Sequence, residues 1–309
     1  MRNHIVNGIS ALAEHDSRIV IVTADLGFGV LEGFAKKFPD RYVNCGIAEQ
    51  NMAAVAAGLA LEGDVVFTYS IGNFPTLRCL EQIRNDICYH NANVKILAVG
   101  GGFSYGSLGM THHATEDLSI MRSLPNMRVY APADPVEAET VLREVYQIDG
   151  PCYVRLARGG DPILNTNCIN TLKIISERDA DVSILTAGTI YAEGEAAKKR
   201  LQELGVTVAL YSFPCVKPID RSMVLKIAEN SKLIVTVEEN QVAGGFGASV
   251  AEILSEYCKH PPVLRIGLED TYTSVVGSQA YLRQYYKIDG NSIAERTVTF
   301  LRGIGLCEL

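Results

Sequence analysis

The sequence predicts an α/β protein with two consecutive domains, each built on a mostly parallel sheet flanked by helices. Short runs of β-branched and other apolar residues alternate with helix-type patterns over the 309 residues. This alternation is interrupted in a polar stretch at 159–177. Apolar strands separated by helices are typical of parallel sheets that are covered on both faces.

Each expected element is defined by the period of its apolar residues. The expected strands are 19–24, 65–69, 94–99, 127–131, 153–156, 181–187, 206–211, 233–238 and 263–266. The expected helices between them are 51–61, 76–91, 135–147, 193–204, 221–230 and 247–257. The segment 277–301 is expected to add two helices that close the second domain.

The polar stretch at 159–177 places the domain boundary. Its sequence GGDPILNTNCIN is rich in turn-forming residues and has no apolar periodicity. We therefore expect a first domain at 1–172 and a second at 173–309.

Composition excludes several classes of protein. The net charge is -7 with no run of like charges, so neither nucleic acid nor an acidic membrane surface is an expected partner. The N-terminal MRNHIVNGIS lacks an apolar signal core, and no stretch reaches the ~20 apolar residues that span a bilayer. The eight cysteines are scattered, which favours reduced thiols and no metal site. We expect a cytoplasmic protein.

A first candidate site residue is Glu49, which follows a short extended segment at 42–44 and begins a helix made almost entirely of small apolar residues. A helix of this composition lets other backbones approach closely, and an acid at its start is stabilised by the helix dipole. From composition alone, a simple capping carboxylate is the favoured interpretation of Glu49.

Further candidates lie in a glycine-rich loop and after a strand. His112 and His113 precede a helix, where a neutral imidazole can act as an acid, a base or a hydrogen-bond donor. Adjacent side chains point in different directions, so at most one of the two normally reaches a given atom. Arg155 and Arg158 in YVRLARGG could receive a phosphate or carboxylate. Taken alone, each pattern also fits an ordinary surface loop.

Two glycine-rich segments match known functional motifs only incompletely. Gly102 to Gly106 match the G-x-S-x-G nucleophile elbow, but the following residues do not start the helix that this motif needs. The glycines around Phe246 resemble a dinucleotide loop, but Val250 stands where its last glycine belongs.

Taken in order, the segments resemble one family over nearly the whole chain. TADLGFG, GIAEQNMAAVAAG, TYSIGNFPTLRCLEQIRND, GMTHHATEDLSIMRSLPNMRVYAPAD and YVRLARG resemble the pyrimidine-binding domain of transketolases. ILTAGT, SFPCVKPID and TVEENQVAGGFGASV resemble the C-terminal domain of the same family. The coverage and order make this resemblance far more specific than any single motif.

The resemblance implies the C-terminal half of a split transketolase, because the G-D-G…N motif of the family's diphosphate-binding domain is missing. In this family each active site lies between the pyrimidine domain of one unit and the diphosphate domain of another. The implied cofactor is thiamine diphosphate (ThDP), with Mg²⁺ bound mainly by the partner subunit. The expected enzyme is an α2β2 heterotetramer that transfers a two-carbon ketol unit from a ketose or its phosphate to an aldose. The chain is expected to be active only with its partner.

Cofactor-side roles follow from the resemblance. Glu49 matches the glutamate that hydrogen-bonds the aminopyrimidine ring and supports the proton relay of the cofactor. Phe74 is the preferred match for the aromatic residue that packs on the pyrimidine, with Tyr69 second. Asp25 and Leu26 match an Asp-Leu pair close to the cofactor and the subunit interface.

Substrate-side roles are implied in the same way. His112 matches the histidine that faces the reacting hydroxyls, His113 is an extra imidazole nearby, and Arg158 matches an arginine that contacts a phosphate or equivalent group. The family often carries an acid just before this histidine, where Leu108 to Met110 stand here. We therefore expect a modified or unphosphorylated sugar in place of the usual pentose phosphates.

Other functions stay open at this point. The β subunit of a 2-oxoacid dehydrogenase shares the layout and also pairs with a separate chain, but would need a lipoyl-bearing partner. A deoxyxylulose phosphate synthase-like carboligase is a variant within the first class. A regulatory module without activity is disfavoured by the joint presence of Glu49, His112 and Arg158.

Overall fold

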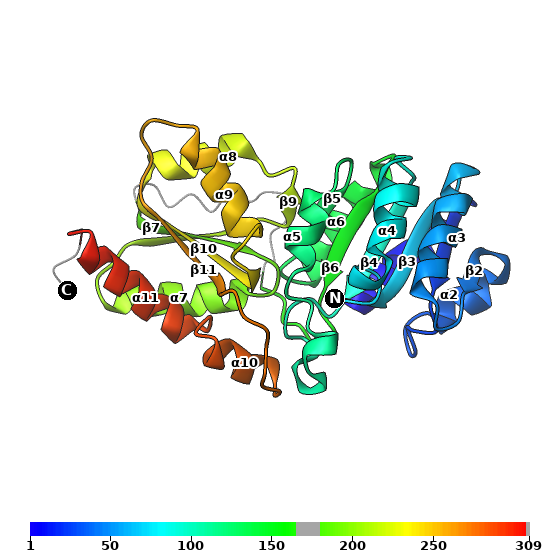
Figure 1. Cartoon of the computed structure of the whole chain (residues 1–309), viewed down its shortest axis with the longest axis horizontal. Coiled ribbons are helices and arrows are strands. Elements are labelled where there is room, and N and C mark those ends of the chain that lie inside the picture. Colours follow the sequence, from blue (N-terminus) through cyan, green and yellow to red (C-terminus); the bar gives the residue numbers. More distant parts are fainter. Residues whose placement is uncertain (165–179, 307–309) are drawn as a thin grey trace.

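The structure, a computed structural model, describes residues 1–164 and 180–306. The domain boundary expected between 172 and 173 lies outside the described residues. Two sheets form the molecule, one in each half of the chain (Figure 1). The predicted α/β class with mostly parallel sheets is confirmed.

The first sheet has seven strands in the order β2-β1-β3-β4-β6-β5-β9. All neighbours in this sheet are parallel except β5 and β9. The strands are β1 (Ile19–Thr23), β2 (Tyr42–Asn44), β3 (Val65–Ile71), β4 (Val94–Val99), β5 (Arg128–Tyr130), β6 (Cys152–Leu156) and β9 (Cys215–Lys217).

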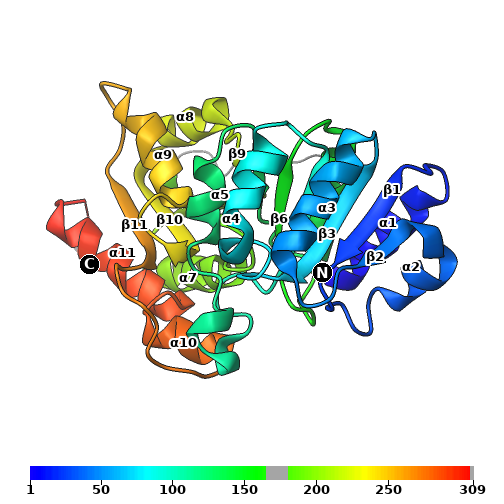
Figure 2. The ribbon, with the colours of Figure 1, turned by 45° about the vertical axis from the view of Figure 1, so that its right-hand side comes forward.

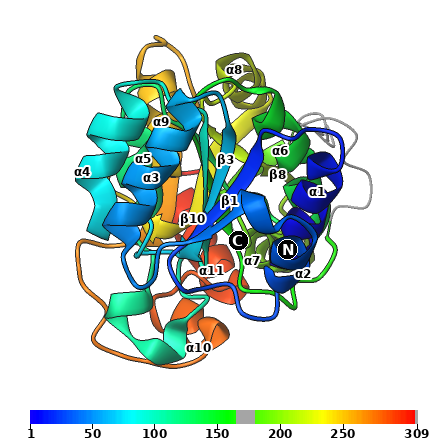
Figure 3. The ribbon, with the colours of Figure 1, turned by 90° about the vertical axis from the view of Figure 1, so that its right-hand side faces the viewer.

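Helices cover both faces of this sheet (Figure 3). On one face, α1 (Arg2–Ala13) and α6 (Pro135–Gln147) bury their apolar stripes against side chains such as Phe67 and Leu97. On the other face, α3 (Glu49–Leu61) and α5 (Asp117–Ser123) pack against neighbours such as Val66. The alternation of strand side chains between faces separates these two cores. The short helix α2 (Glu32–Lys37) follows β1.

The second sheet has four parallel strands in the order β11-β10-β7-β8. They are β7 (Ala180–Ala187), β8 (Val208–Ser212), β10 (Ser231–Gln241) and β11 (Val263–Leu268). Figure 1 shows α8 (Arg221–Glu229) and α9 (Phe246–Ser255) on one face, with α7 (Tyr191–Glu203) and α11 (Gly290–Gly303) on the other. The short α10 (Gln279–Tyr285) precedes α11.

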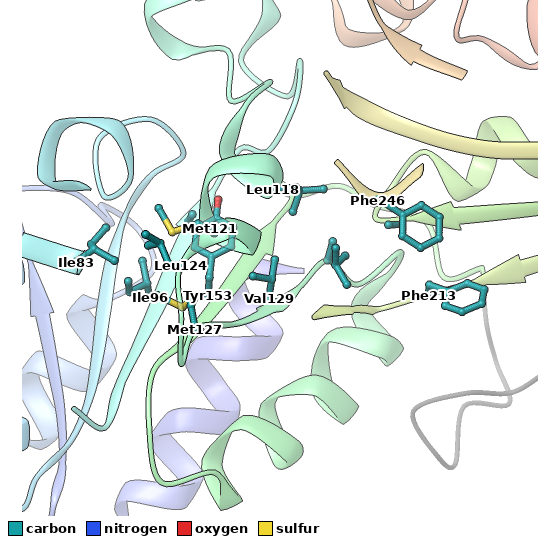
Figure 4. Close-up of a cluster of buried hydrophobic side chains, with 14 of the residues drawn as sticks. Ile83, Ile96, Leu118, Met121, Leu124, Met127, Val129, Tyr153, Phe213 and Phe246 are labelled. Carbon is teal, nitrogen blue, oxygen red and sulfur yellow. The ribbon is translucent and has the colours of Figure 1, made fainter. Parts of the chain in front are cut away.

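The two halves share a core. Strand β9 comes from the second half but pairs antiparallel with β5 of the first sheet, with Val129 opposite Lys217. One apolar cluster also runs from Leu118 and Val129 to Phe213 and Phe246 (Figure 4). The phenyl rings of Phe213 and Phe246 lie 5.5 Å apart. The first half is therefore held firmly against the second.

Several elements differ from the expectations. Strand β9 was not expected because it is short and flanked by Pro214 and Pro218, which are tolerated at the edge of a sheet. Helix α1 was also missed, although Ile5 and Ile9 mark its buried stripe. The single helix expected at 76–91 is instead a 3₁₀ turn, one α-turn at α4 (Leu80–Gln82) and a π-helix (Ile83–Cys88). Such π segments are frequent near functional sites.

In the described part of the chain, no helix is long and apolar enough to cross a membrane.

Candidate functional site

The expected site residues gather at one edge of the first sheet. Asp25 follows β1, Glu49 follows β2, Phe74 follows β3, His112 lies in the loop after β4, and Arg158 follows β6. The carboxyl ends of parallel strands meet at the same edge, which is where ligands bind in sheets of this type. The loop that carries His112 packs against α10 of the second half (Figure 2), where Gly277 donates a hydrogen bond to the Gly106 carbonyl.

Glu49 is the first residue of α3, and its side chain is only 2% exposed. Arg78 donates a hydrogen bond from Nη1 to Glu49 Oε2 at 2.7 Å. The N-cap residue Ala48 offers no side-chain hydrogen bond, and the bond that the carboxylate accepts comes from a guanidinium. The simple capping interpretation therefore does not describe Glu49, which is a buried carboxylate with a dedicated cation beside it.

Arg78 also connects Glu49 to the two other central residues. Its guanidinium lies over the Phe74 ring, 4.9 Å from the centroid. The His112 imidazole meets the same ring edge-on, with 5.2 Å between centroids. Glu49, Phe74 and His112 are thus brought together through one residue that the sequence did not single out. The only sequence signal for Arg78 was its place in the segment TYSIGNFPTLRCLEQIRND.

The two adjacent histidines have different surroundings. His112 is partly exposed, with Nδ1 3.0 Å from Thr111 Oγ1. Burial, and next the charge of His113, lower the pKa of His112 below its ordinary value, which favours a neutral imidazole at neutral pH. His113 is buried, with Nε2 3.1 Å from the Gly106 carbonyl and its ring 5.2 Å from that of Phe103. The structure therefore brings His112, and not His113, to the open edge.

The two arginines of YVRLARGG also differ in their surroundings. Arg155 is buried, donates from Nη2 to the carbonyls of Ala114 and Glu239, and has Nε 3.2 Å from Asp117 Oδ2. Arg155 is therefore an interior ion-pair residue. Arg158 is exposed, and its guanidinium lies over the ring of Tyr105, 5.2 Å from the centroid.

Tyr105 completes a line of contacts across the site. Its ring lies 6.4 Å from the ring of His112 and beneath the guanidinium of Arg158. The line runs from the buried carboxylate through Arg78, Phe74, His112 and Tyr105 to Arg158. It gives the site one acidic end and one cationic end.

Tyr69 lies elsewhere. Its ring is buried in the core that includes Leu31 and Phe34, on the sheet face opposite to α3. Within 1–164 and 180–306, no ring contact joins Tyr69 to Phe74. Because side chains alternate along β3, Tyr69 could not share the face of Glu49, so Phe74 is the aromatic residue beside that carboxylate.

Asp25 and Leu26 flank the same edge. Asp25 adopts a left-handed conformation (φ 53°) and is tied to Asn44, whose Oδ1 accepts from the Asp25 amide at 2.9 Å. Asn44 Oδ1 also accepts from the Gly46 amide at 3.0 Å, so this side chain fixes the turn that leads into Glu49. The half-buried Leu26 is held by a hydrogen bond from Thr23 Oγ1 to its carbonyl.

The structure explains why neither of the two incomplete glycine motifs, at 102–106 and around Phe246, acts as the motif that it resembles. Ser104 Oγ donates to the Gly101 carbonyl at 2.8 Å, and only a 3₁₀ turn follows it. At the start of α9, Glu238 accepts from the amides of Phe246 and Gly247 at 2.7 and 2.9 Å. The position that a dinucleotide phosphate would need is therefore occupied by a carboxylate. No cluster of three or more metal-binding side chains occurs among the described residues.

Comparison with known proteins identifies the family. The sequence profile of the transketolase pyrimidine binding domain matches residues 1–160, and that of the transketolase C-terminal domain matches residues 171–293. The chain belongs to the transketolase family.

Some members of the transketolase family resemble this chain over their whole length, and others resemble it over one half of theirs. The chain is 34% identical to a subunit of the apulose-4-phosphate transketolase of Phocaeicola vulgatus, covering 97% of each chain. It is 37% identical to 1-deoxy-D-xylulose-5-phosphate synthase 1 of Geobacter sulfurreducens, covering 96% of this chain and 47% of that one. A solved split gene transketolase, described as an inactive β4 tetramer, superimposes with a TM-score of 0.86 at 34% identity, covering 95% of each chain. These matches confirm the prediction that the chain is the C-terminal subunit of a split transketolase, which is a transferase of ketol units.

Proposed function

We propose that this transketolase subunit works in an α2β2 assembly with a chain that carries the diphosphate-binding domain, and that their shared site holds ThDP with Mg²⁺ bound mainly by the partner. The reaction is transfer of a two-carbon ketol unit from a ketose to an aldose, in the carbohydrate metabolism of the cytoplasm. The single observation that carries this proposal is the line of contacts from Glu49 to Arg158.

The acidic end of that line fits an aminopyrimidine. Arg78 donates a hydrogen bond to Glu49 Oε2, whereas Glu49 Oε1 has no hydrogen-bond partner within the described ranges. The buried carboxylate therefore has one oxygen free to bind a ligand, and a partly exposed phenyl ring lies beside it. A flat heterocycle fits this pair, because its edge can hydrogen-bond the carboxylate while its face packs on the phenyl ring.

When bound, ThDP supplies the carbon atom that carries the two-carbon unit. Glu49 Oε1 would hydrogen-bond the pyrimidine ring and hold a proton there, and Phe74 would pack on the ring. Asp25 and Leu26 would lie close to the cofactor at the interface with the partner subunit. The neutral imidazole of His112 exchanges a proton with the reacting hydroxyl of the sugar. His113, which is bonded to the Gly106 carbonyl, supports the loop that carries His112.

The surface around the site suits a protein partner. Phe28 and Ile47, in the loops after β1 and β2, are 73% and 80% exposed. Leu77, Leu108 and Met110 are further exposed apolar side chains near Phe74 and His112. Large apolar side chains gathered around polar site residues mark a surface that another protein covers. The partner chain therefore completes the site over these residues.

The sugar is expected to be a modified one that carries an anionic group. Leu108, Gly109 and Met110 replace the acid that recognises a sugar hydroxyl in many family members, which disfavours ordinary pentose phosphates. Arg158 remains exposed at the far end of the site. The relative from Phocaeicola vulgatus is named for a phosphorylated sugar, apulose 4-phosphate, which supports an anionic group on the substrate.

Coexpression with the partner chain tests this proposal. We expect native mass spectrometry to give a 2:2 complex, and ketol transfer to require both chains, ThDP and Mg²⁺. Transfer by this chain alone, or a complex that stays inactive with every ketose donor tried, would contradict it. Efficient transfer from xylulose 5-phosphate to ribose 5-phosphate would refute the proposed choice of sugar.

A further inference from the structure

Asn73 lies next to Phe74 in the sequence and next to His112 in space. We propose that Asn73 is a positioning residue that holds His112 against Phe74, and so fixes the substrate-side imidazole relative to the ring on which the cofactor packs. This inference rests on the proposed function, since it concerns the same site. It adds a residue that acts through the backbone of the loop around His112 rather than by contact with the reacting atoms.

The side-chain amide of Asn73 binds the backbone on both sides of His112. Its Nδ2 donates to the carbonyl of His113 at 2.5 Å and to the carbonyl of Thr111 at 3.3 Å. The bond to His113 is the shorter of the two and is therefore the main anchor. One amide group thus holds both the residue before His112 and the residue after it, which restricts the direction in which the imidazole can point.

The two acceptors decide the orientation of the Asn73 amide. Carbonyl oxygens only accept hydrogen bonds, so a reversed amide would place Oδ1 against two other oxygens and be repelled. Oδ1 therefore faces away, and it is buried without a hydrogen-bond partner within 1–164 and 180–306. A buried acceptor without a partner is unfavourable. The stabilising contribution of this amide therefore comes from the bonds that Nδ2 makes to the loop.

Gly72 allows Asn73 to reach this loop. A Cβ atom on Gly72 would lie 2.7 Å from the Cβ of Ala114 and 3.3 Å from the Gly100 carbonyl oxygen. A larger residue would therefore push the end of β3 away from the loop. The Gly72 amide also donates to the Val99 carbonyl at 2.7 Å, which continues the pairing of β3 with β4. The end of β3 thus brings the Asn73 side chain within reach of its two acceptors.

The ends of the loop, residues 102–114, are fixed without Asn73. Gly102 and Ala114 exchange backbone hydrogen bonds of 2.7 Å and 3.0 Å. Towards the middle of the loop, the side chains of Leu108 and Met110 are 54% and 50% exposed, so apolar packing holds this part only weakly. Loss of the Asn73 bonds should therefore loosen the middle of the loop and leave its ends in place.

The turn that contains Asn73 also sets the position of Phe74. The Phe74 amide donates to the Ile71 carbonyl at 2.8 Å, and the Asn73 carbonyl accepts from the Leu77 amide at 3.1 Å. The Phe74 ring meets the His112 ring with 5.2 Å between centroids. Adjacent residues of one turn therefore supply the ring and fix the backbone of the imidazole, so the two groups keep their relative position.

A double-mutant cycle in the assembled complex tests whether Asn73 acts through His112. We expect Asn73→Ala to lower kcat/KM for the donor ketose by at least about 10-fold, because a small misplacement of a reacting group is costly. In a His112→Ala background the same substitution should change kcat/KM by less than about 2-fold, since no imidazole is left to misplace. Losses that multiply in the double variant, or an unchanged kcat/KM in Asn73→Ala, would refute the positioning role.

Two further variants separate the hydrogen bonds of Asn73 from the shape of its side chain. Asn73→Asp keeps the shape but presents only acceptors to the two carbonyls, so we expect kcat/KM to fall at least as far as in Asn73→Ala. Activity of Asn73→Asp at the wild-type level would overturn the inference. Asn230→Ala is the control that leaves kcat/KM unchanged, because exposed Asn230 makes a similar side-chain bond to the Lys226 carbonyl at the end of α8.

Hydrogen exchange in the assembled complex separates this inference from the proposed function, because it needs no turnover. The amides of His112 and His113 donate to carbonyls three residues earlier, at 2.9 and 3.2 Å. We expect both amides to exchange at least about 5-fold faster in Asn73→Ala than in the wild type, while the Ala114 amide keeps its rate. If the complex transferred no ketol unit but showed this difference, the positioning by Asn73 would stand and the proposed function would fail. Equal exchange in both proteins would refute the positioning.

Discussion

The guanidinium of Arg78 contacts both Glu49 and Phe74. It donates to Glu49 Oε2 at 2.7 Å and lies 4.9 Å from the centroid of the Phe74 ring. The carboxylate is 2% exposed, whereas the arginine side chain is 49% exposed. The same group therefore neutralises a buried charge and shields the ring on which a cofactor is proposed to pack. Arg78 is a positioning residue, and its removal should affect both folding and cofactor binding.

We expect Arg78→Ala to lower the free energy of unfolding by about 1–2 kcal/mol, because the buried carboxylate loses its cation but solvent reaches the site. Arg78→Lys should lose less stability, since it keeps the charge but not the planar group that stacks on Phe74. Urea titration measures both values. Arg84→Ala is the matched control, because in the described ranges the exposed side chain of Arg84 hydrogen-bonds only the Asn85 side chain. An equal loss of stability in Arg78→Ala and Arg84→Ala would contradict the positioning role.

Glu49→Gln should leave folding and assembly intact but abolish turnover. The amide keeps the shape of the side chain and an oxygen for Arg78, but it cannot hold the proton that the cofactor relay needs. We expect kcat of the assembled complex to fall by at least about 100-fold. Native mass and thermal unfolding serve as controls for assembly and folding. Turnover near the wild-type rate would show that the role assigned to Glu49 is wrong.

His112→Ala should chiefly impair use of the donor ketose. The imidazole lies beyond Phe74 from Glu49, so its loss should leave the affinity for ThDP within about 3-fold while kcat/KM for the donor falls by about 100-fold. Calorimetry with ThDP and steady-state kinetics measure the two quantities. A large loss of ThDP affinity would contradict this placement of His112.

The pH profile gives a separate test of His112. Burial, followed by the charge of His113, lowers the pKa of His112 from its ordinary value of 6.5. If the neutral imidazole is the active form, kcat should decline as pH falls, with the midpoint of the decline below pH 6.5. His112→Gln should remove this decline. A decline centred above pH 6.5, or one that His112→Gln retains, would show that another group controls the profile.

The sequence predicted most of the fold because strands and helices depend on local apolar periodicity. Strand β4 and helix α6 were placed at the bounds that the structure shows. Strand β9 was missed because it has three residues and is stabilised by pairing with β5, which is distant in sequence. The segment 76–91 has a helical pattern, but hydrogen-bond periodicity decides between α, 3₁₀ and π turns, and apolar spacing does not reveal it.

The sequence could indicate the site residues of its motifs but not their neighbours. Glu49, Phe74, His112 and Arg158 were all predicted from the family resemblance, and the structure brings them to one edge. Apart from its place in the segment TYSIGNFPTLRCLEQIRND, Arg78 carries no signal, since its importance comes from its contacts with the side chains of Glu49 and Phe74. The family resemblance separated His112 from His113, but only the structure shows that the His112 imidazole is partly exposed and the His113 imidazole is buried.

Glu238 gives a prediction about stability in the second domain. Burial raises the pKa of this carboxyl from 4.5 to about 7, against the opposing effect of the hydrogen bonds from the Gly247 and Phe246 amides. Between these two values the unfolded chain has released the proton while the folded chain retains it. Raising the pH through this range therefore favours the unfolded state, by a contribution on the order of 3 kcal/mol. Below pH 4.5 and above about 7 the contribution of Glu238 no longer changes with pH.

Glu238→Gln should remove this pH-dependent contribution, because an amide does not titrate. We expect the wild type to lose stability relative to Glu238→Gln as pH rises from 4.5 to 7, measured by urea titration of both proteins at pH 4.5, 5.5, 6.5 and 7.5. Glu238→Gln should also be less stable at every pH, since its amide nitrogen would face a backbone N–H at the start of α9. Glu229→Gln, which alters an exposed acid at the end of α8, should follow the wild-type curve. A stability difference between wild type and Glu238→Gln that is constant across these pH values would show that the folded protein holds Glu238 as the carboxylate throughout.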